Sequence, residues 1–394
     1  MTDGRFGRTP GLGALYAAAF IGLGVYLPFF PVWLQSRGVE PDVIGVLLAI
    51  PIVVRIVATT PVMMLADGGF GARKLLLASF VLSIAANLAL SRVTGFAAIG
   101  LLLGMAALAQ VAIIPATDFV AGDAVRHDRR LDYGRIRLWG SIAFLAANVG
   151  AGYAIANTAP DMVMWLLIVL PVTGIAATVL AVPEALGAKT SDARPQDGQT
   201  ARVPPALWVF VAAVACNHAS HAGLYGFATL SWRAQGFSDP TIGWLWATGV
   251  VAEIVLFAVL GRTVGGSSNA VHLLRIGAVA VVVRFAALSL QPGLPATFAL
   301  QALHGLTFGA THLAGMAAIV AMAPAGARAR AQGLVSALVA LASAVATVAS
   351  GVVFRAAGPM VFLALAPLGV VALALSFFVG ARAPAQPQSV GEGG

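Results

Sequence analysis

Residues 41–60 read PDVIGVLLAIPIVVRIVATT, in which the charged groups are Asp42 near the start and Arg55. A continuous apolar run of about 20 residues can cross the hydrocarbon core of a bilayer as a helix. The run does not alternate between apolar and polar residues, as the strand of a membrane barrel would, and lipid requires backbone groups to be paired within the segment. This stretch therefore predicts a membrane-spanning helix.

The rest of the chain has the same character. Of its 394 residues, 59% are hydrophobic and 10% are charged, which does not fit a surface that faces water. Apolar runs of spanning length lie near residues 12–34, 43–65, 74–91, 96–120, 138–158, 161–182, 206–230, 241–261, 274–291, 295–323, 331–354 and 358–380. The sequence predicts an all-α membrane protein with 12 transmembrane helices, and the lipid bilayer is its first partner.

The runs form two sets of six. We expect an N-terminal six-helix bundle in residues 1–182 and a C-terminal bundle with a short cytoplasmic tail in residues 206–394. Residues 183–205 between them contain Pro, Gly, Ser, Thr and charged residues, which predicts a flexible cytoplasmic linker.

Basic residues are distributed unevenly over the loops. With the N-terminus inside, 17 of the 23 Lys and Arg lie on the cytoplasmic side, four lie outside and two lie within the membrane. Cytoplasmic loops normally carry this excess. Both termini are therefore expected in the cytoplasm.

A short pattern occurs in both sets. Residues 41–45 read PDVIG and are followed by Arg55, while residues 239–243 read DPTIG and are followed by Glu253, each charged residue eleven positions after the Ile. Two repeated six-helix halves are typical of transporters that move about a central site. Equivalent positions then carry opposite charges.

Several classes of protein are disfavoured. One cysteine, Cys216, allows no internal disulfide and no cysteine-built metal cluster, and no Walker A sequence or nucleophile constellation is present. The basic residues form no long run, so a nucleic-acid partner is not expected. His218 and His221 have a spacing that suits a metal, but a third ligand is not apparent. We expect no enzyme activity, no cofactor and no metal.

Ionisable residues within the spans are the main functional candidates, because a charge near the bilayer centre costs about 2.5 to 3.5 kcal/mol on insertion scales. They are Arg55, Asp118, His218, His221, Glu253, Arg284, His304 and His312. Helical spacing places His218, His221 and Tyr225 on one face, and Gln301, His304 and His312 on another. The two polar faces predict one shared cavity.

Glu253 is interpreted as a proton carrier, because burial favours a neutral carboxyl group whereas a neighbouring cation favours the charged form. A static ion pair is the alternative. Arg284 is either its counter-charge or a planar clamp for an anionic substrate. Arg55 has the same two interpretations and a third, packing between the halves. His304 is the best candidate for a proton relay, and an interhelical hydrogen bond is the alternative.

Tyr225 and Trp246 are either members of the aromatic belts at the membrane surface or flank an aromatic substrate. Asp118 lies near the cytoplasmic end of the fourth span, where pairing with Arg135 or Arg137 across the next loop would form a structural or gating salt bridge.

The loop at residues 65–74 places Asp67, Arg73 and Lys74 on the cytoplasmic side. A conformational latch is the functional interpretation of this acid and its two bases. The alternative is the ordinary excess of positive charge in cytoplasmic loops.

The twelve spans and this loop resemble the major facilitator superfamily, although Gly71 lies four residues beyond Asp67, one more than in that family's usual pattern. Residues 131–141, LDYGRIRLWGS, resemble the entry to the fifth span in the phenylpropionate permease family. Later stretches resemble the same family: YGF at 225–227, GVVAE at 249–253, LH at 303–304 and THLA at 311–314.

This resemblance implies a proton symporter of the bacterial inner membrane that imports small aromatic acids and uses the proton gradient. A more distant similarity to lactose permease places Glu253, Arg284 and His304 at positions matching its proton-coupling acid, arginine and histidine. The acid expected one turn after that histidine is Thr307 here. Proton handling would therefore depend more on Glu253 and on His312.

The sequence thus predicts a monomeric, proton-coupled symporter of a small organic anion that works by alternating access. Arg284 or Arg55 would bind the anion, while His304 and His312 tune Glu253. The other residues expected to bind the substrate are His218, His221, Tyr225 and Trp246. One alternative is a sugar or nucleoside symporter. Another is an exporter of drugs or metabolites, although the fifth span lacks the Gly-Pro-x-x-Gly-Gly pattern of drug antiporters.

Overall fold

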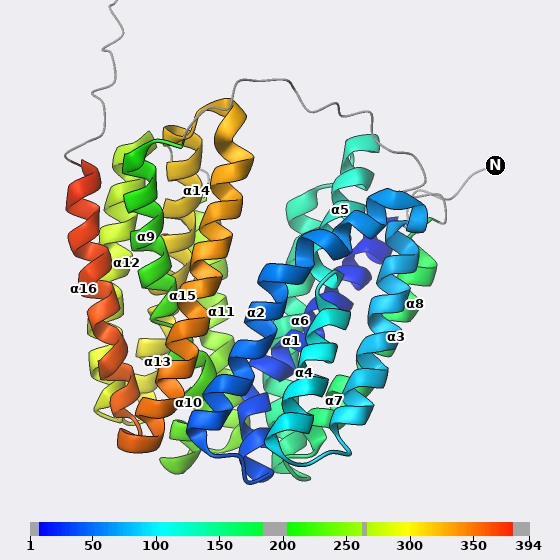
Figure 1. Cartoon of the computed structure of the whole chain (residues 1–394), viewed down its shortest axis with the longest axis horizontal. Helices are drawn as coiled ribbons and strands as arrows, with labels where there is room; N and C mark the ends of the chain where they lie inside the picture. Colours follow the sequence, from blue (N-terminus) through cyan, green and yellow to red (C-terminus); the bar gives the residue numbers. More distant parts are fainter. Residues whose placement is uncertain (1–7, 184–202, 262–265, 381–394) are drawn as a thin grey trace, which may run out of the picture.

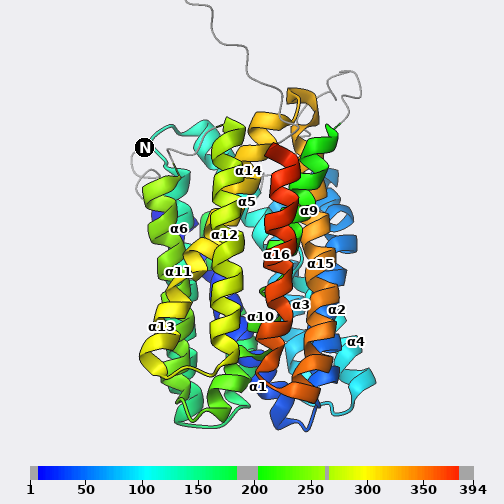
Figure 2. The same ribbon diagram turned by 90° about the vertical axis from the view of Figure 1, so that its left-hand side faces the viewer.

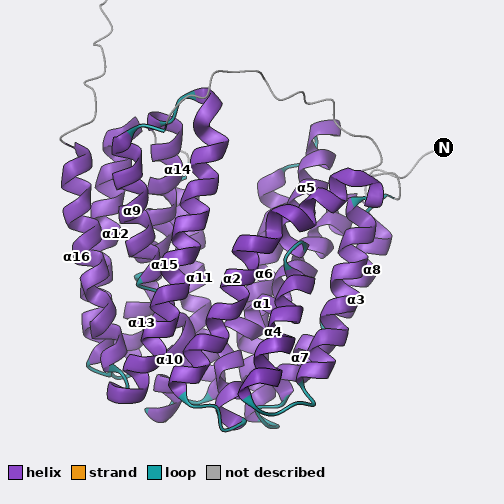
Figure 3. Ribbon diagram, in the orientation of Figure 1, coloured by secondary structure: helices purple, strands orange, loops and turns teal. Residues whose placement is uncertain are grey.

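The computed structural model describes residues 8–183, 203–261 and 266–380, and in these ranges the chain consists of helices and short connections (Figure 3). Twelve helical segments are long and apolar enough to cross a membrane, which confirms the predicted fold class. The elements are α1 (Arg8–Ser36), α2 (Pro41–Leu65), η1 (Ala66–Phe70), α3 (Ala72–Leu90), α4 (Phe96–Gln110), α5 (Ile113–His127), α6 (Tyr133–Ala156), α7 (Met162–Val169), α8 (Pro171–Ala181), α9 (Pro205–Ala219), α10 (Ala222–Ala234), α11 (Asp239–Leu260), α12 (Gly266–Ser289), α13 (Leu294–Ala302), η2 (Gly305–Ala310), α14 (Thr311–Met322), η3 (Ala325–Ala327), α15 (Arg328–Ala357) and α16 (Met360–Gly380).

Some spans run beyond their apolar core. The fourth extends over Phe96–His127, whereas the apolar run ends near residue 120. The added turns carry an ion pair between Arg126 and Asp123, three residues apart, at 3.1 Å. Such pairs support a helix in water, so the helix continues where the hydrophobic signal has stopped.

The helices form two bundles (Figure 1). Elements α1 to α8 make one half, and α9 to α16 make the other, which faces the viewer in Figure 2. Most of the predicted linker lies outside the described residues. We call the end of the molecule where α8 stops and α9 begins the linker end, and the opposite end the far end. The ribbons of the two halves are close together at the far end and separate toward the linker end (Figure 1).

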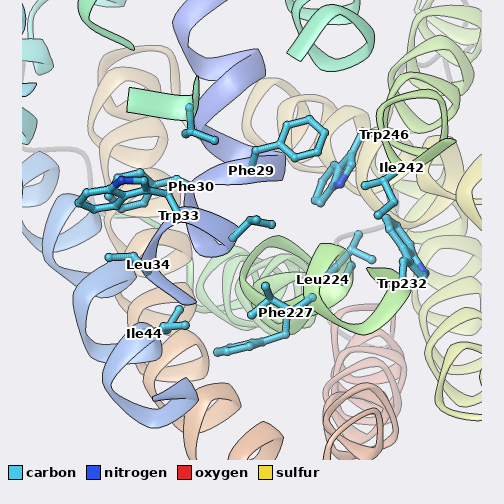
Figure 4. Packing of buried hydrophobic residues seen from close by; sticks show 14 of the residues in the cluster. Phe29, Phe30, Trp33, Leu34, Ile44, Leu224, Phe227, Trp232, Ile242 and Trp246 are labelled. Carbon is cyan, nitrogen blue, oxygen red and sulfur yellow. The ribbon is translucent and has the colours of Figure 1, made fainter. Parts of the chain in front are cut away.

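Hydrophobic packing follows the same division. At the far end one cluster of buried side chains includes Phe29 and Trp33 of α1, Phe227 and Trp232 of α10 and Trp246 of α11, so it belongs to both halves (Figure 4). Toward the linker end each half has a cluster of its own, built from α1, α3, α5, α6 and α8 in one half and from α9, α12, α14, α15 and α16 in the other. The halves therefore share a core at the far end only.

Small residues allow the backbones of α2 and α15 to approach closely at the far end. A Cβ added to Gly45 would lie 2.8 Å from the carbonyl oxygen of Thr347 and 3.0 Å from the Cα of Gly351. A Cβ added to Gly351 would lie 2.6 Å from the carbonyl oxygen of Pro41. Distances below 3.0 Å leave no space for a side chain, so both positions require glycine for this packing.

The repeat produces a second contact of the same kind between α11 and α6. A Cβ added to Gly243 would collide with the carbonyl oxygen of Asn148, and one added to Gly152 with the carbonyl oxygen of Asp239. Gly243 stands in the repeat where Gly45 stands in the first half. Thus α2 packs on α15 as α11 packs on α6, and each contact joins the two halves.

Candidate functional site

A buried arginine organises the polar interior of the C-terminal half. Arg284 of α12 is completely buried. Its Nη1 donates to His304 Nδ1 at 3.1 Å and to Thr307 Oγ1 at 2.9 Å, and its Nη2 donates to Gln301 Oε1. All these partners come from the tenth span and none is an acid. Among the described residues no carboxylate oxygen lies within 4.0 Å of this guanidinium group.

The tenth span can surround Arg284 because it contains a π-helical turn, η2, at Gly305–Ala310. A π-turn inserts an extra residue and changes which side chains face a neighbouring helix, and such turns are frequent at functional sites. Here Thr307 Oγ1 meets Arg284 and also lies 3.0 Å from His221 Nε2. In the sequence, Thr307 is notable only because it occupies the position at which lactose permease has an acid.

Asn217 of α9 was missed by the sequence analysis. Its Nδ2 donates to the carbonyl oxygen of Thr307 at 3.1 Å and to Thr311 Oγ1 at 2.5 Å, and the residue is completely buried. It therefore fastens the π-turn to the seventh span. The signal that could have found it is an amide in an apolar run, four residues before His221 and thus on the same helical face.

Glu253 of α11 adds a carboxyl group to this network. Its Oε2 lies 3.9 Å from His304 Nε2, and the side chains of Glu253 and His304 are 23% and 11% exposed. A carboxyl, an imidazole and a guanidinium group thus follow one another from Glu253 through His304 to Arg284. The three residues expected to share a site do meet, and the carboxyl group is the most accessible of the three.

Aromatic rings border the series formed by Glu253, His304 and Arg284. Tyr225 of α10 stacks on Trp246 with ring centroids 6.0 Å apart, and it lies 6.4 Å from His304 edge to face. Trp246 is buried, and its Nε1 donates to Thr229 Oγ1 at 3.0 Å. It therefore lies inside the bundle and not in a belt at the membrane surface.

All four membrane histidines contact one phenyl ring, that of Phe308 in the π-turn. Ring centroids lie 4.8 Å from His218, 5.8 Å from His221, 5.2 Å from His304 and 6.5 Å from His312. In the part of the chain that the structure describes, no three His, Cys, Asp or Glu residues are grouped as metal ligands would be. Phe308 lies between the rings of His304 and His312, whereas His221 contacts the His304 ring directly, with centroids 5.3 Å apart.

A second polar cluster lies in the N-terminal half. Asp118 Oδ1 accepts hydrogen bonds from the hydroxyl groups of Tyr16, at 2.5 Å, and Tyr133, at 3.0 Å. Arg137 Nη1 lies 3.4 Å from the same oxygen. Of the two arginines expected to pair with Asp118, Arg137 does so; the hydrogen bond found for Arg135 is that of its backbone N–H, which donates to Asp132 Oδ1 at 3.0 Å, where Asp132 caps α6.

Arg137 belongs to the second cluster. Its charge acts on Glu253 and His312 of the other half at long range, while its hydrogen-bond partners are Asp118 and Tyr133. Its side chain is 51% exposed. Glu253, His312 and Arg137 therefore border the same region between the halves.

Arg55 is separate from these groups. Its side chain is exposed, and no hydrogen bond or ion pair to a described residue is found for its guanidinium group. It lies near the middle of α2, where Val53 and Val57 are also exposed at 47% and 66%. No contact brings Arg55 to Arg284 or Glu253. An ionised group at this depth needs water or a counter-ion beside it.

The loop after the second span lies at the linker end. The structure does not describe the side chain of Asp67, so the acid of the expected latch lies outside the described groups. Arg73 Nη2 donates to the carbonyl oxygen of Val179 at 3.4 Å, within the same half, and Lys74 is exposed.

Twin six-helix bundles that share a core at one end, with ionisable side chains buried between apolar spans, define a secondary transporter and not an enzyme. Comparison with known families agrees, since residues 11–364 match the MFS_1 like family. The chain belongs to this family, and within the major facilitator superfamily it groups with the phenylpropionate permease.

Individual relatives show the same relationship. The chain is 32% identical over 311 residues to the probable 3-phenylpropionic acid transporter of Escherichia coli (strain K12), covering 78% of this chain and 80% of the relative. The solved structure of the nucleoside transporter NupG is 17% identical with a TM-score of 0.79, covering 95% of this chain and 98% of that one. A bacterial homolog to the human lysosomal transporter Spinster is 13% identical with a TM-score of 0.70, covering 95% and 96%. At these identities the two structures show the fold alone.

Proposed function

We propose that this protein is a proton-coupled symporter that imports a small aromatic acid by alternating access. The observation that carries the proposal is the chain from Glu253 through His304 to Arg284, because a carboxyl group beside a histidine and a buried arginine can change its charge according to what surrounds it. The aromatic acid is suggested by the name of the E. coli relative, the probable 3-phenylpropionic acid transporter.

Arg284 serves as the counter-charge in this scheme. Both of its terminal nitrogens already donate to side chains of the tenth span, and the group is fully buried. Its positive charge is therefore fixed in the interior with neutral partners. Loss of a proton from Glu253 creates the compensating negative charge, and proton binding removes it again.

The carboxylate of the substrate would bind to an exposed cation between the halves. Arg55 is the candidate, since its guanidinium group is exposed and offers a planar pair of donors that suits a carboxylate. The ring of an aromatic acid would lie against Tyr225, which already stacks on Trp246 beside His304. The aromatic ring would thus lie beside His304, whereas the carboxylate would be held at Arg55, apart from the proton-binding group.

In this proposal the protein is a monomer of the bacterial inner membrane, and the conformation that is open toward the linker end is its inward-facing state. The linker end carries most of the basic residues, so the positive-inside rule places it in the cytoplasm. Transport would require the shared core at the far end to separate while the linker end closes.

Uptake by proteoliposomes tests the proposal. We would measure uptake of 3-phenylpropionate, a sugar and a nucleoside with and without an imposed pH gradient, for the natural protein, for Glu253→Gln and for Glu40→Gln as an exposed acid control. We expect gradient-driven uptake of the aromatic acid that Glu253→Gln loses and Glu40→Gln retains. Uptake of the acid that ignores both the gradient and Glu253→Gln would refute proton coupling. Uptake of the sugar or nucleoside instead would refute the substrate class.

A further inference from the structure

Two of the histidines line a small cavity that the substrate scheme does not use. The cavity lies between α9, α14 and α15 and has a volume of about 30 Å³. His218 and His312 border it together with Gln332, and Val214 and Gly315 complete part of the wall. It extends from the level of the two imidazoles toward the linker end, where α15 begins.

The imidazole of His218 lacks a hydrogen-bond partner among the described residues, although the residue is only 9% exposed. A buried imidazole has one donor and one acceptor to satisfy, and buried polar groups are normally paired with protein or water. About 30 Å³ accommodates roughly two water molecules, and a buried water needs two to four polar partners. The two imidazoles and the amide of Gln332 supply them.

Resting on the function proposed above, we propose that this cavity is a hydrated proton-access site that connects the linker end with Glu253. His218 and His312 hold water in it, and the accessible side chain of His312 takes the proton from this water or returns it. On its way to Glu253, a proton passes from cavity water to an imidazole nitrogen of His312 and then from that imidazole to the Glu253 carboxylate. A proton that leaves Glu253 takes the same steps in reverse. No bond other than those to the proton is made or broken.

The surroundings of His312 favour Glu253 as the next group. His312 packs against Phe257 of α11, with centroids 6.0 Å apart, one helical turn from Glu253. A Cβ added to Gly309 would lie 3.5 Å from Glu253 Cγ and 3.6 Å from the Phe257 ring, so these groups are neighbours. The charged or titratable groups that act on His312 are Arg137 from α6 and His218 from α9, and the contact of Gly309 with Glu253 brings the carboxyl group of α11 to the same turn of the tenth span.

Direct transfer from His312 to His304 is blocked. The ring of Phe308 stacks against His304 at an interplanar angle of 12° and against His312 at 1°, and the three residues follow one another at intervals of four. A phenyl ring has no group that accepts and releases protons, so it insulates one imidazole from the other. From His312, a proton therefore reaches His304 by way of Glu253, whereas from His218 the neighbouring imidazole is His221, whose ring centroid lies 6.5 Å from His218 and 5.3 Å from His304.

The test compares two modes of 3-phenylpropionate movement in proteoliposomes that contain the full chain. Net uptake driven by a pH gradient requires protons to enter and leave the site, whereas exchange of labelled for unlabelled substrate at equilibrium does not. We expect His218→Gln and His312→Gln to slow net uptake at least about tenfold, because a positioned proton-transfer group contributes rate factors of this size or larger. Exchange should stay within about twofold of the natural protein.

A variant that narrows the cavity tests the same proposal without replacing either histidine. A Cβ added to Gly315 would lie 3.7 Å from Val214, an ordinary contact, so Gly315→Ala fits and takes space from the water. It should slow net uptake and spare exchange. Gly104→Ala is the matched control. Its Cβ would lie 3.6 Å from Ile50, an equally ordinary contact, and both residues belong to the N-terminal half, away from the cavity.

Three results would overturn the proposal. Net uptake and exchange that decline together in the histidine and Gly315 variants would show a structural role only. Net uptake that none of these variants changes would show that protons take another route. Gradient-independent uptake by the natural protein would refute proton coupling itself and this proposal with it, whereas a gradient effect that survives in every variant refutes the cavity alone.

Discussion

Arg355 of α15 lies 2.8 Å from Asp42 of α2, and this ion pair joins the two halves at the far end. The pair stands beside the close approach of Gly45 to Gly351, so charge and backbone packing hold the same interface. Both residues are accessible to water, which makes the ion pair sensitive to salt.

Neutralising Asp42 should loosen the far end. In Asp42→Asn we expect a cysteine placed at Ala151, which is buried in the core that both halves share, to react faster with a membrane-impermeant thiol reagent, in a background where Cys216 is replaced by Ser. The double variant Asp42→Arg with Arg355→Asp restores an ion pair and should return the labelling rate toward that of the natural protein. Equal labelling in all three would show that the ion pair does not hold the halves together.

The glycine contacts predict a position-specific effect within one helix. Gly152→Ala forces a methyl group against the backbone of Asp239, and overpacking of this kind costs about 1 to 3 kcal/mol. Gly150→Ala, two residues earlier, meets nothing within 4 Å. Spin-label distances between the halves at the far end should increase in the first variant and stay unchanged in the second. Identical distances would mean that α6 adjusts without separating from α11.

Arg284→Lys keeps the buried positive charge but loses the planar group that reaches three side chains. Hydrogen bonds to charged groups contribute about 1.5 to 3 kcal/mol each, so the variant should unfold at a clearly lower temperature in detergent. Arg275→Lys is the control, because Arg275 is only partly buried and donates to Ser376 at 3.0 Å. A Tm shift no larger than that of the control would contradict the role of Arg284 as organiser of the tenth span.

Two buried asparagines allow a matched comparison. Asn217→Ala removes the donor to the Thr311 hydroxyl and one of the two side-chain donors to the Thr307 carbonyl, the other being Thr311 Oγ1, which should lower the free energy of unfolding by about 1 to 3 kcal/mol. Asn148→Ala removes an amide whose oxygen and nitrogen have no partner among the described residues, so it should be close to neutral. Denaturation of both variants in detergent distinguishes them. The reverse order would indicate that the π-turn does not depend on Asn217.

Arg55→Gln should weaken binding of an aromatic acid without abolishing the turnover of bound substrate. Loss of one charge-assisted contact of about 1.5 to 3 kcal/mol raises KM by roughly 10- to 100-fold. Arg92→Gln, at an exposed arginine near the far end, serves as the control. A reduced maximal rate at unchanged KM would assign Arg55 to the conformational change instead of the substrate.

Much of this organisation can be predicted from the sequence. The twelve spans follow from apolar length alone, and Glu253, His304 and Arg284 are conspicuous because lipid excludes charge. The motif at residues 41–45 and 239–243 indicates the repeat, although it does not reveal that its glycines face α15 and α6.

The remaining features depend on packing between distant segments. The π-turn at Gly305–Ala310 adds one residue to a helix whose composition gives no sign of it, and this addition brings Thr307 to Arg284. The bond from Tyr16 to Asp118 joins residues 102 positions apart. Neither can be derived from helical spacing, which describes one helix at a time.

The aromatic cluster shared by the halves at the far end has a thermal consequence. When that end opens, rings such as Trp33 and Phe227 exchange protein neighbours for water, so opening carries a positive heat-capacity change. Apolar contact weakens on cooling. The free-energy difference between the inward-facing and outward-facing states should therefore depend non-linearly on temperature. Lower temperature should increase the fraction of molecules that face outward.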